Sequence, residues 1–441
     1  MKAVLKKMQA TLLMAHLGFS GGSHGQAVDL SGMPDYPLQA VTEATWSRSS
    51  DNMRWMSSHF SVKPSLVLSR GARVYDIPLK LQDRQTIEQQ SFMPPGSTGP
   101  VTLLKALQQA DVDSYLVLKD GKLIYQRYFG GFSEHTHHSW FSGAKSLIGM
   151  AIGILAEQGQ LDVDKTPSHY ISALRGSAYE SVNIRQALNM TAALSYTEDP
   201  NAMAPGHFRH EYLKRAGMLP PYDLFQLTLE PGQSAIPRGV RSLLPLLEPS
   251  ELVKPGTSFD YQNINVDLAG WLIEVVSGVP LDRFLRDSVW SKLQAEHDAF
   301  IPTDPNYTAL AAGGLSSTAR DLARFGLAVA HGGVLGSEQV FPASWINDTC
   351  QFTEADRLAF DNRRKSPGDF SALGSIKAYR NYWYIHDRQR CAMASRGYGG
   401  QSVYINRARG VVIVTFASAT AANRENNNRV MYITHLLADG L

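Results

Sequence analysis

The sequence lacks any long hydrophobic run. No stretch of about 18 uninterrupted apolar residues occurs in the 441-residue chain, so we expect no stable membrane insertion. The sequence also lacks an excess of either charge, because 42 Lys and Arg stand against 40 Asp and Glu. A phosphate-binding surface usually appears as basic excess, so we expect no nucleic-acid partner. The two cysteines are too few for a disulfide scaffold or a four-thiolate zinc site.

What is present is an ordinary globular composition. Hydrophobic residues make up 44% of the chain and charged residues 19%, so we do not expect intrinsic disorder. At roughly 100–200 residues per domain, the length predicts two domains, or one large domain with an insertion. A chain of this size and composition is typical of an enzyme.

The N-terminal segment 1–27 has the layout of a secretory signal. Lys2, Lys6 and Lys7 precede a mainly apolar stretch at 8–19, and Gly- and Ser-rich residues follow. We therefore expect a periplasmic or secreted protein. The alternative is a cytoplasmic protein with an amphipathic start, because polar residues interrupt the apolar stretch.

Strand patterns lie toward both ends of the chain, with helical patterns between them. Residues 114–129 predict a hairpin around an Asp120-Gly121 turn, since both residues accept positive φ. A helix is expected from Ser142 to about Gln158. The other expected elements are a helix near 52–55, a helix at 318–328, strands at 402–406 and 411–417, and a terminal helix through 434–437.

These elements predict a chain in four parts. After the signal segment, residues 28–100 form an N-terminal extension without chemistry. We expect an α/β domain made of 101–159 and 301–441, and a mainly helical domain at 160–300 inserted into it. The oligomeric state is not readable from the sequence.

Ser142 and Lys145 carry the strongest chemical signal. They lie three residues apart at the start of a predicted helix, so their side chains share one face and the lysine nitrogen can reach the serine hydroxyl. A serine needs an adjacent base to attack, and a desolvated lysine can act as one. The helix N-terminus adds N–H groups for a developing oxyanion. The alternative is an N-capping serine beside a surface lysine.

Tyr261 is the second candidate. It precedes Asn263 on a short loop that leads into a predicted helix, where a phenol could move a proton between nucleophile and leaving group. The same Tyr-x-Asn pattern occurs at Tyr379 and Tyr404, but both of these lie in predicted strands. Tyr261 is preferred for its position between loop and helix.

The third candidate segment is Gly397-Tyr398-Gly399-Gly400-Gln401, directly before a predicted strand. Glycines at such a position allow a ligand or another backbone to approach closely. We expect Tyr398, Gly400 and Gln401 to contribute to substrate binding. The alternative is a plain glycine-rich turn.

Together these motifs resemble the serine β-lactamase and penicillin-binding-protein superfamily. The order Ser142-x-x-Lys145, Tyr261-x-Asn263, Tyr398-Gly399-Gly400 is most similar to class C-related hydrolases, which include esterases and 6-aminohexanoate-dimer hydrolases. Two further segments look like that family: Pro255-Gly256-Thr257-x-Phe259 and Gly313-Gly314-Leu315-Ser316-Ser317-Thr318-Ala319-x-Asp321. The resemblance covers about residues 100–441. It implies a β-lactamase/transpeptidase-like fold, in which helices flank an antiparallel sheet and the site lies beside an inserted helical domain.

The resemblance also assigns roles. Ser142 would be the acylated nucleophile, Lys145 its base, and Tyr261 the group that protonates the leaving group and activates the deacylating water. Asn263 would position substrate or Lys145, and the Ser142 and Gln401 N–H groups would form the oxyanion hole.

One departure from the family pattern affects the expected substrate. The third motif of lactamases usually begins with Lys, whereas this chain has Tyr398, flanked by Arg396 as the available replacement cation. This departure favours a small-molecule ester or linear amide over a β-lactam. The alternatives are a catalytically weak, penicillin-binding or sensor-like protein, and a true β-lactamase or D-peptidase.

The histidines at His135, His137 and His138 suggest a metal site, and with it a metallohydrolase. Adjacent histidines rarely converge on one ion without distant ligands, so we expect a polar loop, no metal site and no cofactor. Cys350 and Cys391 are expected to pair if the protein is exported, provided that their Cα atoms approach within about 7 Å.

Overall fold

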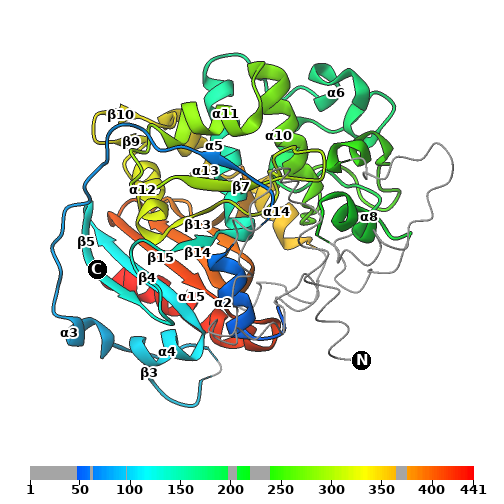
Figure 1. Ribbon diagram of the computed structural model, residues 1–441. Coiled ribbons are helices and arrows are strands. Elements are labelled where there is room, and N and C mark those ends of the chain that lie inside the picture. Colours follow the sequence, from blue (N-terminus) through cyan, green and yellow to red (C-terminus); the bar gives the residue numbers. More distant parts are fainter. Residues whose placement is uncertain (1–46, 60–62, 96, 197–205, 219–238, 364–374) are drawn as a thin grey trace, which may run out of the picture. The chain divides into compact units, whose positions relative to one another are not determined.

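The computed structural model describes residues 47–59, 63–95, 97–196, 206–218, 239–363 and 375–441. All of them belong to one compact unit, which spans Val41–Leu441. The predicted signal segment at 1–27 lies outside the described residues. Figure 1 shows the arrangement of the elements within this unit.

A seven-stranded antiparallel sheet is formed by the two ends of this unit. The predicted hairpin forms β4 (Val112–Lys119) and β5 (Lys122–Tyr128), and both turn residues, Asp120 and Gly121, have positive φ. The strand order is β11-β12-β13-β14-β15-β4-β5, so β4 pairs directly with the last strand of the chain. The C-terminal strands are β11 (Ala378–Arg380), β12 (Trp383–Asp387), β13 (Ala392–Gly397), β14 (Gln401–Asn406) and β15 (Val411–Ala417).

Helices cover both faces of this sheet. Successive side chains of β15 point to opposite faces of the sheet. Ile413 packs against α4 (Leu103–Gln109) and α15 (Arg424–Gly440) on one face. Val412 and Val414 pack in the hydrophobic cluster on the other face. That second cluster includes α5 (Ala144–Glu157) and α12 (Ala319–Ala330). The sequence therefore predicts the antiparallel, helix-flanked architecture correctly.

A smaller antiparallel sheet leads into the segment that carries Ser142. Its order is β1-β7-β8-β6, with β1 at Ser65–Leu68, β7 at Ala299–Pro302, β8 at Ser316–Thr318 and β6 at His137–Ser139. β1 comes from the predicted extension, which also contributes the expected helix as α2 (Ser50–Ser58), capped by Ser49. The rest of the extension holds α3 (Arg84–Glu88) and β2 (Ser91–Phe92), which pairs with β3 (Val101–Thr102).

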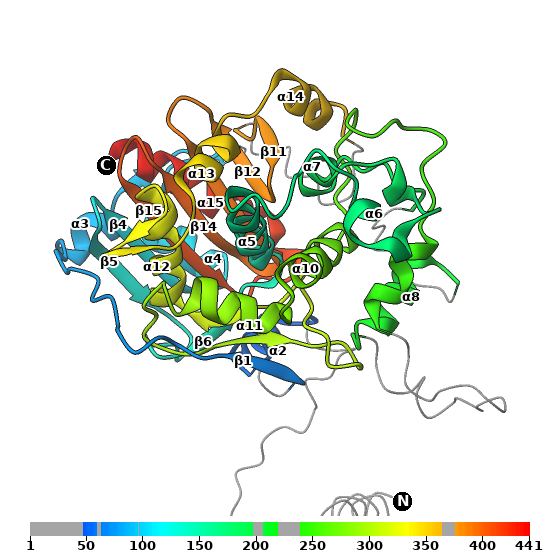
Figure 2. The ribbon, with the colours of Figure 1, turned by 90° about the horizontal axis from the view of Figure 1, so that it is seen from above.

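The region from 160 to 300 consists mainly of helices and turns in its described residues, except that its last two residues already belong to β7. Its elements are α6 (Pro167–Tyr170), η3 (Ser172–Leu174), η4 (Ala178–Glu180), α7 (Ile184–Leu188), α8 (Phe208–Arg215), η5 (Val240–Leu246), α10 (Ile264–Ser277), α11 (Leu281–Leu285) and η6 (Arg286–Trp290). α10 contacts α5, α6 and α7 (Figure 2). α5 and α10 thus join the helical region to the large sheet.

Membrane insertion can be examined for the helices of the described part of the chain. No single helix there is long and apolar enough to span a bilayer. α10 passes the same length and composition test only together with the segment Leu281–Trp290, which is bent from it by 81°.

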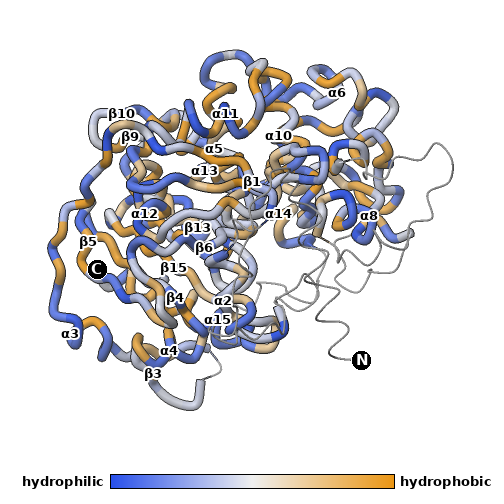
Figure 3. The backbone as a smooth tube through the Cα atoms, viewed as in Figure 1, coloured by the Kyte–Doolittle hydropathy of each residue, from blue (hydrophilic) through white to orange (hydrophobic). Residues whose placement is uncertain are grey.

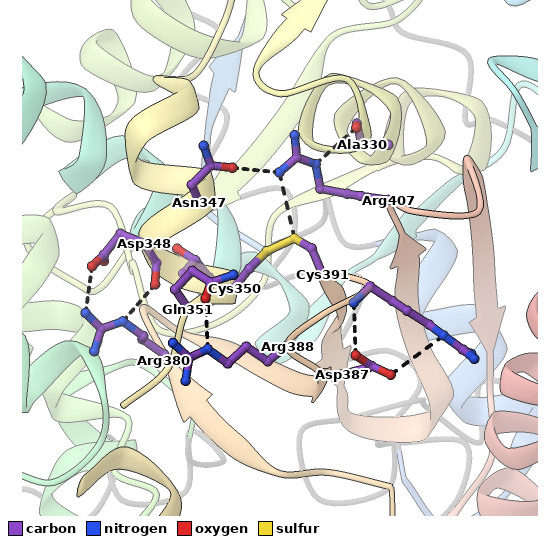
Figure 4. The surroundings of a disulfide bond; sticks show 12 residues. Ala330, Asn347, Asp348, Cys350, Gln351, Arg380, Asp387, Arg388, Cys391 and Arg407 are labelled. Carbon is purple, nitrogen blue, oxygen red and sulfur yellow. Dashed lines mark hydrogen bonds and ion pairs between the residues drawn. A yellow bond between two sulfur atoms is a disulfide. The ribbon is translucent and has the colours of Figure 1, made fainter. Parts of the chain in front are cut away.

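A disulfide ties the remaining helices to the large sheet. α13 (Ala343–Cys350) is followed by α14 (Glu354–Asp361), and β9 (Val334–Leu335) and β10 (Glu338–Gln339) form a short ribbon before them. Cys350 at the end of α13 is bonded to Cys391 in the turn between β12 and β13, with Cα atoms 5.1 Å apart (Figure 4). The expected pairing is therefore present.

Candidate active site

Ser142 lies in a turn that is fixed on both sides. The turn, η2 (Phe141–Gly143), joins β6 to α5. Trp140 anchors its start: the side chain is 1% exposed, its Nε1 donates to Ser317 Oγ at 2.8 Å, and its backbone N donates to Leu315 O at 2.7 Å. Phe141 has a φ of +45°, in the left-handed region that non-glycine residues rarely adopt and that occurs often at functional sites. The nucleophile candidate is therefore held directly before the first turn of α5.

Lys145 reaches Ser142 from the first turn of this helix. Its Nζ donates to Ser142 Oγ at 2.8 Å and also to the Ala312 carbonyl oxygen. Lys145 is 1% exposed because every residue of α5 from Ala144 to Leu155 is buried, and the helix is largely hydrophobic (Figure 3). A buried lysine within hydrogen-bond reach of a serine hydroxyl is the arrangement that a serine–lysine nucleophile and base pair requires.

Tyr261 completes a group of three. Lys145 Nζ lies 5.2 Å from the centre of the Tyr261 ring. The other sides of this ring face Phe259 and Tyr379, with ring centres 6.5 Å away in both cases. Tyr379 is in β11, as the sequence predicts, so the structure brings Tyr261 rather than Tyr379 against the lysine.

The loop that carries Tyr261 is held by its buried neighbour Gln262. The Gln262 amide donates to Tyr196 O at 2.8 Å, and its Oε1 accepts from Asn265 at 3.3 Å. Asn265 in turn accepts a 2.9 Å hydrogen bond from the Tyr179 hydroxyl. Asn263 caps α10, and its carbonyl oxygen accepts from Val266 N at 2.8 Å. The loop is thus fixed before substrate arrives.

Asp267, on α10, is a buried residue that the motif analysis missed. Its carboxylate accepts from the Tyr212 hydroxyl at 2.7 Å and from Ala312 N at 3.2 Å. The same peptide segment offers the Ala312 carbonyl to Lys145. Burial raises the pKa of Asp267 to about 6, while its own hydrogen bonds and the charge of Lys145 act in the opposite direction. Asp267 therefore positions the carbonyl that holds the lysine.

Tyr398 lies at the rim of the site. Its ring is 40% exposed and packs edge-on against Phe141, with ring centres 6.0 Å apart. The glycines beside it face elsewhere: a Cβ at Gly399 would meet Met53, and one at Gly400 would meet Asn427 and Ala417. These glycines permit close packing on α2 and α15, and a role of Gly400 in substrate binding stays a prediction.

Gln401 holds the turn between β13 and β14 with its side chain. Its amide donates to Tyr398 O at 2.9 Å and to Ala417 O at 2.6 Å, and its Oε1 accepts from Ala417 N at 3.1 Å. This side chain is fully engaged with the sheet. The expected oxyanion role concerns the backbone N–H of Gln401 alone.

The end of β13 approaches the Ser142 turn more closely than the motif analysis anticipates. Ser395 Oγ donates to Gly143 O at 2.8 Å. A Cβ at Gly397 would lie 2.1 Å from Trp140 O and 3.1 Å from Gly143 N, so only glycine fits there. The sequence analysis includes Gly397 as the first glycine of its segment. It could not show that Gly397 packs against Trp140 and Gly143, because these residues are distant in sequence.

Arg396 does not take the place of the missing lysine. It follows Ser395 in β13, so its side chain lies on the opposite face of the sheet, where it contacts Met431 of α15 and stacks over Tyr384 at 5.5 Å. Burial lowers the pKa of Arg396 to about 10. The expected replacement cation is therefore directed away from Ser142.

A cavity of about 710 Å³ lies away from this group. It is bounded by α2 and the small sheet, and Ser142, Lys145 and Tyr261 are not among its lining residues. Because it contains none of the paired groups described above, Ser142, Lys145 and Tyr261 remain the candidate site.

Comparison with known proteins identifies the family of the chain. The family model described as Beta-lactamase matches residues 102–438. The chain belongs to the beta-lactamase family. This membership confirms the predicted resemblance, the fold class and the prediction of a hydrolase.

Similar proteins include relatives named as 6-aminohexanoate-dimer hydrolases. The chain is 27% identical over 322 residues to a 6-aminohexanoate-dimer hydrolase of Paenarthrobacter ureafaciens, covering 72% of this chain and 75% of the relative. A Bacillus anthracis protein assigned as a 6-aminohexanoate-dimer hydrolase has the same fold, with a TM-score of 0.75, 24% identity, and coverage of 91% of this chain and 98% of that one. A hydrolase with promiscuous acyltransferase activity matches at a TM-score of 0.51 and 17% identity, covering 75% and 98%.

Proposed function

We propose that this beta-lactamase-family protein is a serine hydrolase that cleaves a small ester or linear amide through an acyl-enzyme intermediate. The observation that carries this proposal is the 2.8 Å contact between Lys145 Nζ and Ser142 Oγ, with the Tyr261 ring beside the same nitrogen. A nucleophile, a base within hydrogen-bond reach and a second proton carrier are the parts that acyl transfer needs.

In the acylation step, neutral Lys145 accepts the proton of Ser142 as its Oγ attacks the substrate carbonyl carbon. The proton then passes by way of Tyr261 to the leaving alcohol or amine as the carbonyl–heteroatom bond breaks. In deacylation, the same groups take a proton from water and the hydroxide oxygen bonds to the acyl carbon. The bond between that carbon and Ser142 Oγ then breaks, Oγ regains its proton, and the carboxylic acid product leaves. Water is the one co-reactant that these steps consume.

Charge on the substrate oxygen requires N–H donors. The N-terminus of α5 places its positive dipole end beside Ser142, and the expected first donor is the backbone N–H of Ser142. We assign the second donor to the hairpin of β13 and β14, because Gly397 approaches Gly143 N and Trp140 O so closely.

The proposed preference for an ester or linear amide depends on the third motif, which begins at Tyr398. Tyr398 replaces the expected lysine, and Arg396 lies on the other face of the sheet. The carboxylate of a β-lactam would therefore lack a charge-assisted hydrogen bond, which is roughly twice as strong as a neutral one. The name of the Paenarthrobacter relative supports a linear amide as substrate.

The test compares kcat/KM for nitrophenyl butyrate, the linear dimer of 6-aminohexanoate and nitrocefin, with Ser142→Ala as control. We expect turnover of the ester or the amide at least tenfold above nitrocefin, and none in the variant. A preference for nitrocefin would show that the substrate class is wrong. Stoichiometric acylation without turnover of any of the three would instead favour a sensor-like binding protein.

We also propose export to an oxidising compartment. The disulfide between Cys350 and Cys391 supports it, because disulfides persist mainly in oxidising environments. Two titratable thiols in protein isolated from such a compartment would contradict it.

A further inference from the structure

The histidine-rich loop before β6 meets a second histidine from a distant part of the chain. His135 Nδ1 lies 3.3 Å from His297 Nε2, and Glu296 is adjacent to His297. One ligand atom from each of these three residues lies within 4.8 Å of the others. The distant partners absent from the sequence pattern are thus supplied by the segment before β7.

The neighbouring histidines have other contacts. His137 Nε2 is 2.8 Å from Asp298 O, and His138 is buried with its Nε2 3.3 Å from Asp113. These two rings lock β6 to its surroundings. The His137 ring also packs edge-on against His297, with ring centres 5.9 Å apart, but its Nε2 is engaged by Asp298 O. His135 is exposed, and its Nδ1 faces His297 Nε2.

The separation of the two nitrogens fits a shared metal ion. Two nitrogens bound to one tetrahedral zinc ion at 2.0–2.1 Å lie about 3.3–3.4 Å apart. Without a metal, the contact between the two nitrogens is a hydrogen bond, in which one imidazole N–H donates to the other ring. A metal ion replaces that proton and adds a bond to each ring.

The segment that carries Glu296 and His297 is already oriented by a buried carboxylate. Asp321, which is fully buried, accepts from Glu296 N at 2.7 Å and from His297 N at 3.2 Å. It is held by Thr318 at 2.8 Å and by Arg324 at 2.7 Å.

Asp321 also faces the imidazole itself. Its Oδ2 lies 3.6 Å from His297 Nδ1, the nitrogen that does not face His135. A metal-bound histidine commonly directs its second nitrogen toward a carboxylate, which fixes the tautomer that leaves the first nitrogen free to bind. Asp321 lies where that carboxylate would be, at a distance just longer than a hydrogen bond.

Glu296 supplies the third ligand. Its side chain is 30% exposed and lies 3.4 Å from Arg324, and one of its carboxylate oxygens is within 4.8 Å of a nitrogen of each imidazole. Two imidazoles and one carboxylate suit zinc and neighbouring divalent transition metals, with a water in the fourth position.

We propose that His135, Glu296 and His297 form a binding site for a divalent transition metal of the zinc class. The ion joins the loop before β6 to the segment before β7, and both strands belong to the sheet that leads into the Ser142 turn. Its expected role is to stabilise this entry to the active-site segment. The site is independent of the proposed hydrolysis.

The experiment titrates zinc chloride into the untagged, chelator-stripped full chain, with a chromophoric chelator as competitor. We expect one zinc ion per chain and a rise in the thermal midpoint. His135→Ala, His297→Ala and Glu296→Gln should each bind at least tenfold more weakly, since loss of even an outer-shell partner costs about 10–100-fold. His169→Ala, which removes another exposed histidine, is the matched control and should bind as the wild type does.

Absence of stoichiometric binding by the wild-type chain would overturn the proposal. Equal affinity of the wild type and His135→Ala would also overturn it, and since His135 is exposed, this variant is expected to fold. Ester turnover and circular dichroism of each variant report folding separately from metal binding.

Discussion

Lys145 and Tyr261 are expected to act as one proton-transfer unit. Tyr261→Phe keeps the ring beside Lys145 and removes only the hydroxyl, and Lys145→Met keeps most of the buried volume. Each change should lower kcat/KM by about 10²–10⁴, the usual contribution of general acid–base catalysis. Because the proton passes through both residues, the double variant should be little worse than the more damaged single variant.

The measurement is a double-variant cycle on a nitrophenyl ester. Losses that multiply in the double variant would show that the two residues act separately. In that case the proposed proton path through Tyr261 would be wrong.

Asp267 should make the free energy of unfolding depend on pH between about 4 and 6. Burial raises its folded pKa from 3.8 to about 6, so the folded state holds this proton more tightly than the unfolded state. The contribution of Asp267 to the free energy of unfolding is therefore greatest below about pH 4 and declines as the pH rises to about 6. Two pKa units correspond to about 3 kcal/mol.

Asp267→Asn removes this titration and keeps the shape of the side chain. The amide can still accept from Ala312 N and can donate to Tyr212. We expect the thermal midpoint of the variant, relative to wild type, to rise by about 3 °C between pH 4 and pH 7. A difference between the two proteins that stays constant over this range would contradict the assignment.

At the scale of elements, β13 packs closely against the Ser142 turn. Gly397→Ala places a methyl group 2.1 Å from the backbone oxygen of Trp140, so strand or turn must shift. A displacement of about 1 Å at the nucleophile can cost on the order of 100-fold in rate. We expect kcat to fall by that order in soluble, folded protein.

Gly99→Ala is the control for this substitution, because a Cβ at Gly99 meets nothing within 4 Å. Both variants are compared by ester turnover and thermal midpoint. Full activity in Gly397→Ala would show that this contact does not position Ser142.

The disulfide is expected to stabilise the junction of α13 with the turn between β12 and β13. Cys350 and Cys391 are 41 residues apart. Closing a loop of this length stabilises the folded state by about 4 kcal/mol in the chain-entropy model. The variant Cys350→Ser with Cys391→Ser should therefore melt about 4–5 °C lower than the oxidised wild type.

Reduction of the wild type should reproduce that shift, which calorimetry with and without a phosphine reductant measures. An unchanged midpoint in both experiments would show that the bond contributes nothing to stability. The double serine variant should be insensitive to the reductant.

At the scale of the whole molecule, local patterns predicted the elements well. The 114–129 hairpin, the helix after Ser142 and the C-terminal strands were predictable because alternation, an Asp-Gly turn and helical spacing are properties of neighbouring residues. The Ser142–Lys145 contact was predictable for the same reason, since one turn of helix fixes it.

Contacts between distant segments were not predictable in this way. Asp267 supports Lys145 only through the Ala312 peptide, and His135 meets His297 only because β6 and β7 share a sheet. The direction of Arg396 depends on the register of β13, which places it on the face opposite to Ser395. Such pairings depend on how strands and helices pack, and no short motif records them.

The identity of the nucleophile is the central claim, and covalent labelling tests it most directly. The full chain is treated with a fluorophosphonate, digested, and mapped by mass spectrometry, with Ser142→Ala in parallel. The account predicts one adduct on Ser142, loss of ester turnover in proportion to labelling, and no adduct in the variant. An adduct on a different serine, or undiminished turnover in Ser142→Ala, would contradict it.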